Sequence, residues 1–216
     1  LGVGNLMTIY DPSGKQYIIN GNYLVNLNKK YNNLIDKLKS KISSKSTKHT
    51  SKEIHNLLIR RENKIDYFFN MIVKWISEKY KQKKIIIGYN INWKKGVNMG
   101  RKNNRKFYEI PYCRLLNKLK FKMSTLGSEV IINEESYTSK CDALALEEIK
   151  KQDVYLGNRT KRGLFSSSIG RLINADINGA INIMRKYLAQ KNIFMTKILG
   201  KSIFNPIRIN IFHEVP

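Results

Sequence analysis

Four carboxylates in this 216-residue sequence follow an apolar run or precede a helical pattern, and these are positions where an α/β protein exposes ligand-binding side chains. They are Asp11, Glu134, Glu135 and Asp176. Two or three carboxylates that converge on Mg²⁺ can hydrolyse a phosphodiester bond, because the metal activates water and stabilises the leaving oxygen. The chemistry therefore depends on which of the four can share a site.

The surroundings of each carboxylate rank them. Asp11 lies in DPSG, a turn sequence in which Asp is preferred for local hydrogen bonds. Glu134 and Glu135 follow VIIN, and because consecutive strand residues face opposite sides, at most one of them reaches a given site. Asp176 is either a helix N-cap or a metal ligand. Gly179 costs about 1 kcal/mol against Ala inside a helix, so we expect tight packing at that position.

The pattern of apolar residues predicts an α/β protein with a mixed sheet and helices packed on it. Strand-like runs stand at 6–10, 16–21, 83–90 and 129–133, and helical periodicity at 24–42, 54–76, 112–126 and from 176 onward. Residues 136–171 are polar with little periodicity, and the segment from 192 is not assigned to any element.

The charge of the chain predicts a polyanionic partner. Forty Lys and Arg face 16 Asp and Glu, a net charge of +24. Nucleic acid is favoured over a membrane surface, because phosphate contacts release counterions and no helix concentrates its basic residues on one face. No run of about eighteen apolar residues and no signal-peptide pattern is present, so we expect a cytoplasmic protein, associated with the nucleoid in a prokaryote.

Two basic segments are candidates for that contact. In the first, Trp93 could stack on a base while its basic neighbours follow phosphates; the alternative is a solvated loop with Trp93 in the core. These neighbours are Lys94, Lys95, Arg101, Lys102, Arg105 and Lys106. The second segment contains Arg159, Lys161 and Arg162.

Four motifs occur in a characteristic order: LGVGNLMTIYD, IIIGYN with its basic sequel, ESYTSKC and NADINGAINIMRK. Together they resemble the C-terminal RuvC-like domain of TnpB, the transposon-encoded RNA-guided endonuclease of the OrfB transposase family, which is related to type V CRISPR effectors. The resemblance covers residues 1–188. It implies an RNase H-like fold, a Mg²⁺ site of three carboxylates, and DNA and guide RNA as partners; it does not fix the oligomeric state.

The resemblance also implies which residues bind the metal. The first ligand would be an Asp directly before Leu1, and the third corresponds to Asp176. The second, a glutamate, falls where this sequence has Gly88 and Tyr89. Because neighbouring strand ends lie about 5 Å apart, Glu135 at the end of the adjacent strand could replace it. Our hypothesis is this relocation, and the alternative is loss of activity.

The same resemblance implies a zinc ribbon of two CxxC pairs in the insert. Only Cys141 is present there, and tetrahedral zinc needs four ligands, so we expect a degenerate ribbon without zinc. The expected domains are a nuclease core at 1–135 with a helical insertion at about 26–82, a target-nucleic-acid-binding insert at 136–171, the last core helix at 172–190 and a tail at 191–216.

Three functions follow for this sequence. The first is the nuclease domain of an RNA-guided DNA endonuclease, with Asp176 and Glu135 as catalytic metal ligands. The second is an RNA-guided DNA-binding protein that does not cut, and the third is an inactive transposon remnant. We expect the 216-residue chain by itself to be inactive, because the first ligand and an upstream recognition lobe are not part of it.

Overall fold

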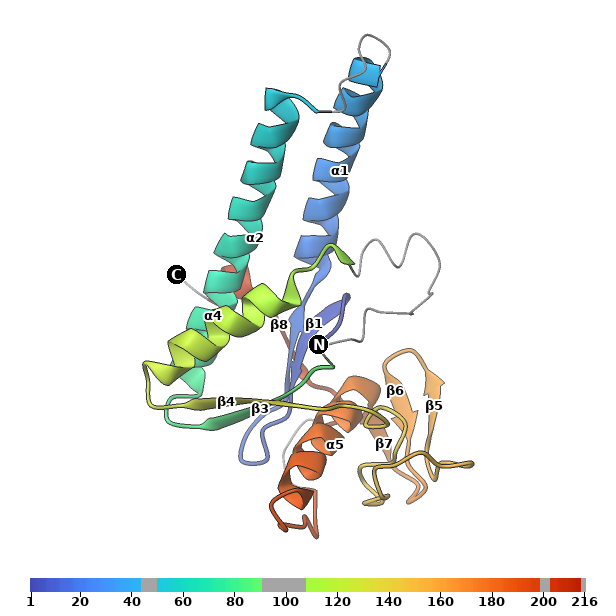
Figure 1. Cartoon of the computed structure of the whole chain (residues 1–216). Coiled ribbons are helices and arrows are strands. Elements are labelled where there is room, and N and C mark those ends of the chain that lie inside the picture. The colour runs from blue at the N-terminus through green and yellow to red at the C-terminus, as the bar shows by residue number, and fades with distance from the viewer. Residues whose placement is uncertain (44–49, 91–107, 199–202, 215–216) are drawn as a thin grey trace.

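The computed structural model describes residues 1–43, 50–90, 108–198 and 203–214. These residues form small sheets and five helices (Figure 1). The strands are β1 (Asn5–Ile9), β2 (Tyr17–Asn20), β3 (Lys84–Gly88), β4 (Glu129–Asn133), β5 (Asn158–Lys161), β6 (Leu164–Ser166), β7 (Leu172–Asn174) and β8 (Ile207–Ile209). The helices are α1 (Asn22–Ser43), α2 (Lys52–Lys79), α4 (Tyr112–Ser124), α5 (Ala175–Ala189) and α6 (Ile211–Glu214). The expected mixed α/β class is confirmed.

The strands belong to three separate sheets rather than to one. In the first, β2 pairs antiparallel with β1 and parallel with β8. In the second, β3 and β4 are parallel, with Gly88 opposite Asn133. In the third, β6 pairs antiparallel with both β5 and β7. A mixed sheet was expected; the described strands form three sheets, of which the first contains both parallel and antiparallel pairs.

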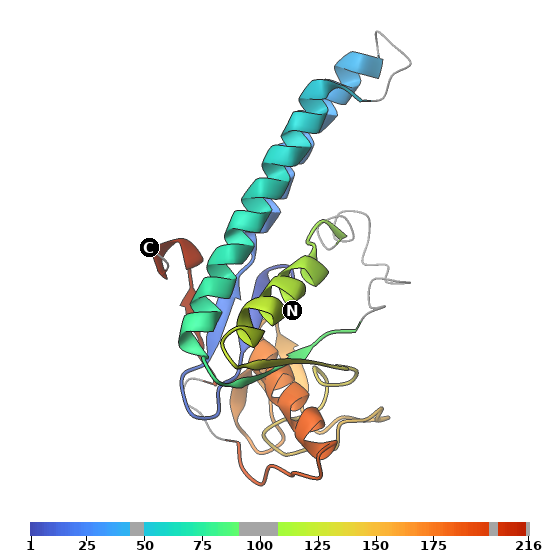
Figure 2. The same ribbon diagram turned by 60° about the vertical axis from the view of Figure 1, so that its left-hand side comes forward.

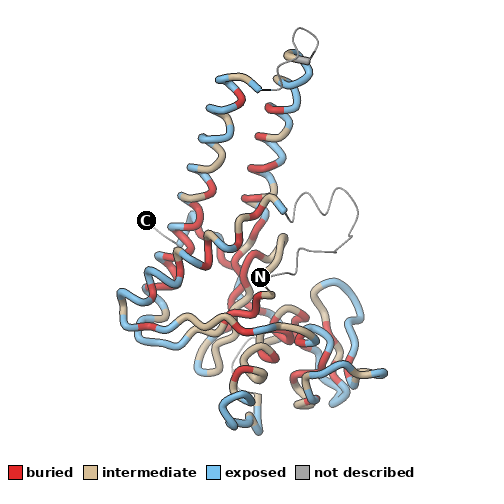
Figure 3. The backbone as a smooth tube through the Cα atoms, viewed as in Figure 1, coloured by how far each residue is buried: buried red, intermediate tan, exposed pale blue. Residues whose placement is uncertain are grey.

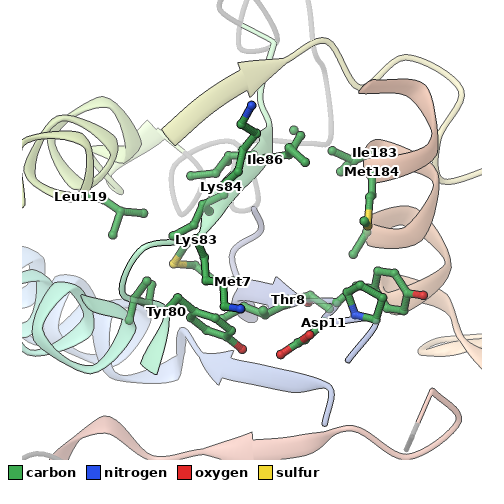
Figure 4. Close-up of a pocket in the computed structure, with 18 of the residues that line it drawn as sticks. Met7, Thr8, Asp11, Tyr80, Lys83, Lys84, Ile86, Leu119, Ile183 and Met184 are labelled. Carbon is green, nitrogen blue, oxygen red and sulfur yellow. The ribbon is translucent and has the colours of Figure 1, made fainter. Parts of the chain in front are cut away.

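A cavity of about 360 Å³ lies where the first two sheets face each other. It lies between β1 and β3, each of which has one strand partner among the described residues, β2 and β4 respectively. Met7 of β1 and Ile86 of β3 line it, with Leu119 of α4 on one side and Ile183 and Met184 of α5 on the other (Figure 4). Side chains rather than backbone hydrogen bonds therefore connect the two sheets, and α5 packs on both.

Helices α1 and α2 form a long hairpin that projects from the sheets (Figures 1 and 2). Helix α2 begins after Ser51, whose hydroxyl accepts a hydrogen bond from the Ile54 amide at 3.3 Å. Its buried side chains include Phe68, Phe69 and Ile72, which join the main core near the sheets. Burial is densest at that end, and the far part of the hairpin is mainly exposed (Figure 3). No helix in the described ranges has the length and apolarity needed to cross a membrane.

Helix α5 follows β7 without a loop. Its N-cap is Asn174, whose side-chain oxygen accepts hydrogen bonds from the amides of Asp176 at 3.0 Å and Ile177 at 3.3 Å. Because Asn174 caps the helix, the reading of Asp176 as its N-cap was wrong. Asp176 lies in the first turn, and its carboxylate is available for other contacts.

Candidate functional site

Glu135 and Asp176 line the same cavity, of about 820 Å³. The first sheet, the insert and α5 surround it, and the chain start from Leu1 to Asn5 forms part of its wall. Glu135 comes from the segment after β4 and Asp176 from the first turn of α5. The two carboxylates that sequence analysis selected as metal ligands are therefore in one polar cavity.

Asp176 has few partners within this cavity. Its side chain is 34% exposed. One carboxylate oxygen, Oδ2, accepts a hydrogen bond from Asn5 Nδ2 at 2.5 Å, and the other, Oδ1, lies 3.9 Å from Arg159 Nη2. Among the described residues, the long contact with Arg159 is thus the one ion pair of this carboxylate, which lines the cavity.

Asn5 connects Asp176 to the C-terminal part of the chain. Its Oδ1 atom accepts a hydrogen bond from Arg208 Nη1 at 3.3 Å. Because arginine can only donate and a carboxylate can only accept, the Asn5 amide has one consistent orientation between them. Sequence analysis missed both residues. Asn5 carries a weak signal as an amide at the start of an apolar strand, and Arg208 carries none.

Glu135 occupies the space beside Gly88. A Cβ atom added at Gly88 would lie 2.7 Å from Glu135 Oε2 and 2.4 Å from Ile183 Cδ1, closer than real Cβ contacts. The Glu135 amide donates to Asn90 Oδ1 at 3.2 Å, which holds the turn after β4 against the end of β3. The Glu135 carboxylate therefore lies where a side chain at position 88 would begin.

The two neighbouring glutamates have opposite electrostatic environments. Burial raises the pKa of the Glu135 carboxyl, and the charge of Glu134 adds to this effect. Burial would also raise the pKa of Glu134, but hydrogen bonds from Lys186 and Ser136 outweigh it and lower that pKa. Glu134 forms an ion pair with Lys186 on α5 and does not line the cavity.

Two asparagines of α5 attach the insert to the helix. Asn178 accepts a hydrogen bond from the Ala143 amide at 3.0 Å and donates to the Cys141 carbonyl at 2.9 Å. Asn182 donates to the Thr138 carbonyl at 2.9 Å. Both asparagines are fully buried, so these bonds fix the start of the insert relative to Asp176, which lies in the first turn of the same helix.

Gly179 lies between these asparagines and lines the cavity. The nearest contact of a Cβ added there would be Ser139 Cα at 3.9 Å, an ordinary van der Waals distance. The expectation that tight packing explains this glycine was therefore wrong. Gly179 leaves the cavity wall beside Asp176 without a side chain.

The buried carboxylate of Asp142 joins two parts of the insert, the segment that begins at Asp142 and the serines that follow β6. Asp142 Oδ2 accepts hydrogen bonds from Ser167 Oγ and the Ser168 amide, both at 2.8 Å. Its Oδ1 accepts from the Leu144 amide at 3.1 Å. Within the described residues, no group of three or more His, Cys, Asp or Glu could hold a metal ion. A network of hydrogen bonds from hydroxyl and amide groups to the Asp142 carboxylate connects these two parts of the insert.

Glu147 continues this network. Its carboxylate accepts hydrogen bonds from the Asp142 amide at 2.6 Å and the Leu156 amide at 3.0 Å. Cys141 is fully buried, and burial raises the pKa of its thiol. Sequence analysis missed Asp142 and Glu147; the available signal was an acidic residue directly after Cys141, followed 25 residues later by a run of serines.

The predicted nucleic-acid contacts are only partly covered by the structure. Trp93 and its basic neighbours Lys94, Lys95, Arg101, Lys102, Arg105 and Lys106 lie outside the described residues. Arg159 and Arg162 line the cavity with Glu135 and Asp176. Lys161 is exposed on β5 and is not part of the cavity wall.

Comparison with known proteins gives two family matches in sequence order. A model described as a probable transposase, OrfB_IS605, matches residues 1–92, and a model described as the Cas12f1-like TNB domain matches residues 112–183. None of the curated proteins matches.

One similar solved structure is the cryo-EM structure of a Cas12f1–sgRNA–target DNA complex. It has 18% sequence identity and a TM-score of 0.50, and the alignment covers 82% of this chain and 51% of that one. At this identity the likeness concerns the fold. The present chain spans about half the length of the Cas12f1 chain.

The first family match supports a protein of the transposase class. The second match, to the Cas12f1-like TNB domain, makes this class more specific. Together, the two matches and the similar structure support a TnpB-type protein, and the resemblance seen in the sequence is confirmed.

Proposed function

We propose that this chain is the nuclease part of a transposon-associated, RNA-guided DNA endonuclease that hydrolyses phosphodiester bonds with Mg²⁺. Its fold would be RNase H-like, of the RuvC type, with Asp176 and Glu135 as metal ligands. Guide RNA and target DNA would be its partners, as the complex of the similar Cas12f1 structure suggests. The insert from 136 to 171 would contact the target nucleic acid without zinc.

The observation that carries this proposal is the position of the Glu135 carboxylate beside Gly88. The family's glutamate is expected at Gly88, and the Glu135 carboxylate lies 2.7 Å from the position where the Cβ of that residue would be. The parallel pairing of β3 with β4 brings the two strand ends together. The carboxylate of Glu135, in the segment after β4, thus lies where the side chain of a glutamate at position 88 of β3 would begin.

The chemistry of the donors fits Mg²⁺. This ion is usually held by one or two carboxylates together with substrate phosphates and water. Asp176 offers Oδ1, while Asn5 holds Oδ2 and orients the group. A cation beside Glu135 would offset the cost of burying its charge. Bound Mg²⁺ would activate water and stabilise the leaving oxygen. Leu1 lines the cavity, so an Asp before it would also be close.

The test uses the full-length protein with its guide RNA, target DNA and Mg²⁺. We expect Glu135→Ala to abolish cleavage while target binding persists. Glu134→Ala is the matched control and should cut at the wild-type rate, because Glu134 pairs with Lys186 outside the cavity. Normal cleavage by Glu135→Ala would overturn the assignment.

A rescue variant sharpens this test. The double variant Gly88→Glu/Glu135→Ala moves the carboxylate to the family position and removes one of the three close contacts at residue 88. Partial recovery of cleavage would show that the two positions serve one metal. Recovery requires Ile183 to shift, so Ile183→Val is added in a third variant.

The second candidate is an RNA-guided DNA-binding protein that does not cut. Gly88 favours it, because a glycine cannot bind a metal through its side chain. This reading predicts that the wild-type protein binds its target with Mg²⁺ present and leaves both strands intact. Glu135→Ala would then change neither binding nor the state of the DNA.

A further inference from the structure

Three arginines from distant parts of the chain line the cavity that holds the carboxylate pair. They are Arg159 on β5, Arg162 in the turn between β5 and β6, and Arg208 on β8. The first two belong to the insert, whereas Arg208 comes from the C-terminal segment, to which sequence analysis gave no role. The cavity is thus lined by guanidinium groups from two separate sheets.

The contacts of these arginines leave most of their donors unused by the described residues. Arg159 has a long contact of 3.9 Å with Asp176, and its side chain remains 52% exposed. Arg208 donates one hydrogen bond to the neutral Asn5. Arg162 Nη2 lies 3.4 Å from the position of a Cβ at Gly4, so the absence of a side chain there leaves room for the guanidinium group.

The charge balance of the cavity favours an anion. Two carboxylates face three guanidinium groups, and the remaining polar lining consists mainly of neutral amides and hydroxyls. A divalent cation on the carboxylates would increase the positive excess. Arginine presents five donors in a planar fork that matches a phosphate group, whereas a lone carboxylate partner would leave several of them unpaired.

The position of Arg208 is built into the fold. Strand β8 pairs in parallel with β2, with Arg208 opposite Ile18, and the Ile207 amide donates to the Gln16 carbonyl at 2.8 Å. Ile209 is 5% exposed and packs in the main core, so the strand is anchored. The guanidinium group of Arg208 is therefore carried by the same sheet as Asn5, on the wall opposite the insert.

We propose that Arg159, Arg162 and Arg208 together bind one phosphate group of a nucleic-acid strand above Glu135 and Asp176. The strand lies between the insert and the first sheet, and Arg208 gives the C-terminal segment a role in substrate binding. This inference rests on the proposed function for the nature of the anion. It concerns binding and not cleavage, so the two can fail separately.

The experiment measures binding of a fluorescent dT6 oligonucleotide to the 216-residue chain in EDTA, by anisotropy at several salt concentrations. We expect Arg208→Gln and Arg162→Gln each to weaken binding by about tenfold, and to reduce the slope of log affinity against log salt by about one. Arg208→Lys should retain the slope but still bind more weakly, because an ammonium cannot make the paired contact.

The matched control is Arg60→Gln, which removes the same charge from an exposed position on α2 that does not line the cavity. It should weaken binding less than twofold. Equal effects of Arg208→Gln and Arg60→Gln would overturn the inference and leave only general electrostatic attraction. A thermal unfolding curve checks that each variant remains folded.

The outcomes separate the inference from the proposed function. Weaker binding by the arginine variants, with a full-length protein that never cuts, would retain the phosphate site and remove the nuclease assignment. Cleavage by the full-length protein together with unchanged binding by Arg208→Gln would retain the nuclease and remove the role of Arg208.

Discussion

Two pairs of carboxylates in this protein lie in contrasting environments. In the insert, Asp142 and Glu147 are buried and accept hydrogen bonds from serine hydroxyls and backbone amides. In the cavity, Asp176 accepts one short bond from Asn5, and burial of Glu135 raises the pKa of its carboxyl. The first pair has the partners that a buried charge requires, whereas the second has room for a ligand.

The comparison teaches how the two pairs can be told apart. A carboxylate that accepts several hydrogen bonds contributes to the stability of the folded structure, and its loss leaves several donors without partners. A carboxylate with few partners contributes little to folding, and its loss is felt in binding or catalysis. The following variants test this division, from the largest expected effect to the smallest.

The largest effect is expected for Asp176→Asn in the full-length protein. If Asp176 holds Mg²⁺ as proposed, loss of its charge should reduce Mg²⁺-dependent cleavage by about 10³-fold, or about 4 kcal/mol. Stability should change by less than about 0.5 kcal/mol, because Asn174 and not Asp176 caps the helix. Cleavage kinetics and denaturant unfolding measure the two quantities. A large loss of stability with intact cleavage would reverse the roles of the two pairs.

Asp142→Ala should have the largest effect on stability. It removes the acceptor for Ser167, Ser168 and the Leu144 amide, so we expect a loss of about 3 kcal/mol in the free energy of unfolding. Asp142→Asn is the control, because it retains the shape and one acceptor oxygen, and should lose less. Because the network consists of hydrogen bonds to protein donors, EDTA should leave the difference in stability between Asp142→Ala and wild type unchanged.

Gly88→Ala should destabilise the protein by about 2 kcal/mol, because the added methyl group collides with Ile183 and Glu135. Combination with Glu135→Ala should recover part of this loss, since the contact with Glu135 disappears while the two with Ile183 remain. Chemical denaturation of the single and double variants gives the coupling directly. Additive losses would show that Glu135 does not occupy the space beside Gly88.

The smallest effect concerns pH. Burial raises the pKa of Glu135 in the folded state, so the folded protein binds its proton more tightly than the unfolded chain does. The carboxylate therefore costs stability above its folded pKa, and this cost disappears as the pH falls through the raised pKa towards the unfolded value. Glu135→Gln should be more stable than wild type at pH 7 in EDTA, and the difference should shrink on acidification.

A control for the pH effect is available at the next residue. Hydrogen bonds from Lys186 and Ser136 lower the pKa of Glu134 against the effect of burial, so its contribution has the opposite sign. Glu134→Gln should be less stable than wild type at pH 7, and this difference should also shrink on acidification. The same sign for both variants would contradict the separate environments of the two glutamates.

The sequence predicted four of the five described helices and four of the eight described strands, because the signals of these elements are local. The apolar spacing from Ile54 to Ile76 placed α2, which spans Lys52–Lys79. The position of Glu135 at the end of a strand next to Gly88 was also predictable, because both strands read as short apolar runs. The N-cap was missed by two residues, since Asn174 and Asp176 are both good caps in the same stretch.

The remaining features depend on contacts between distant residues. The separation of β1 from β3, the pairing of β8 with β2 across about 190 positions, and the link from Arg208 through Asn5 to Asp176 leave no local pattern. Asp142 is similar, because its serine partners stand 25 residues later. Such features follow from how the elements pack, which the order of residues alone does not specify.

The cavity between β1 and β3 affects the rigidity of the site. Glu135 follows the second sheet, Asn5 belongs to the first, and no backbone ladder joins the two sheets among the described residues. Their spacing is maintained by α5, through side chains such as Ile183 and Met184. Small changes in the packing of this one helix should alter the distance between Glu135 and Asp176, so its hydrophobic face sets how precisely the two carboxylates are held.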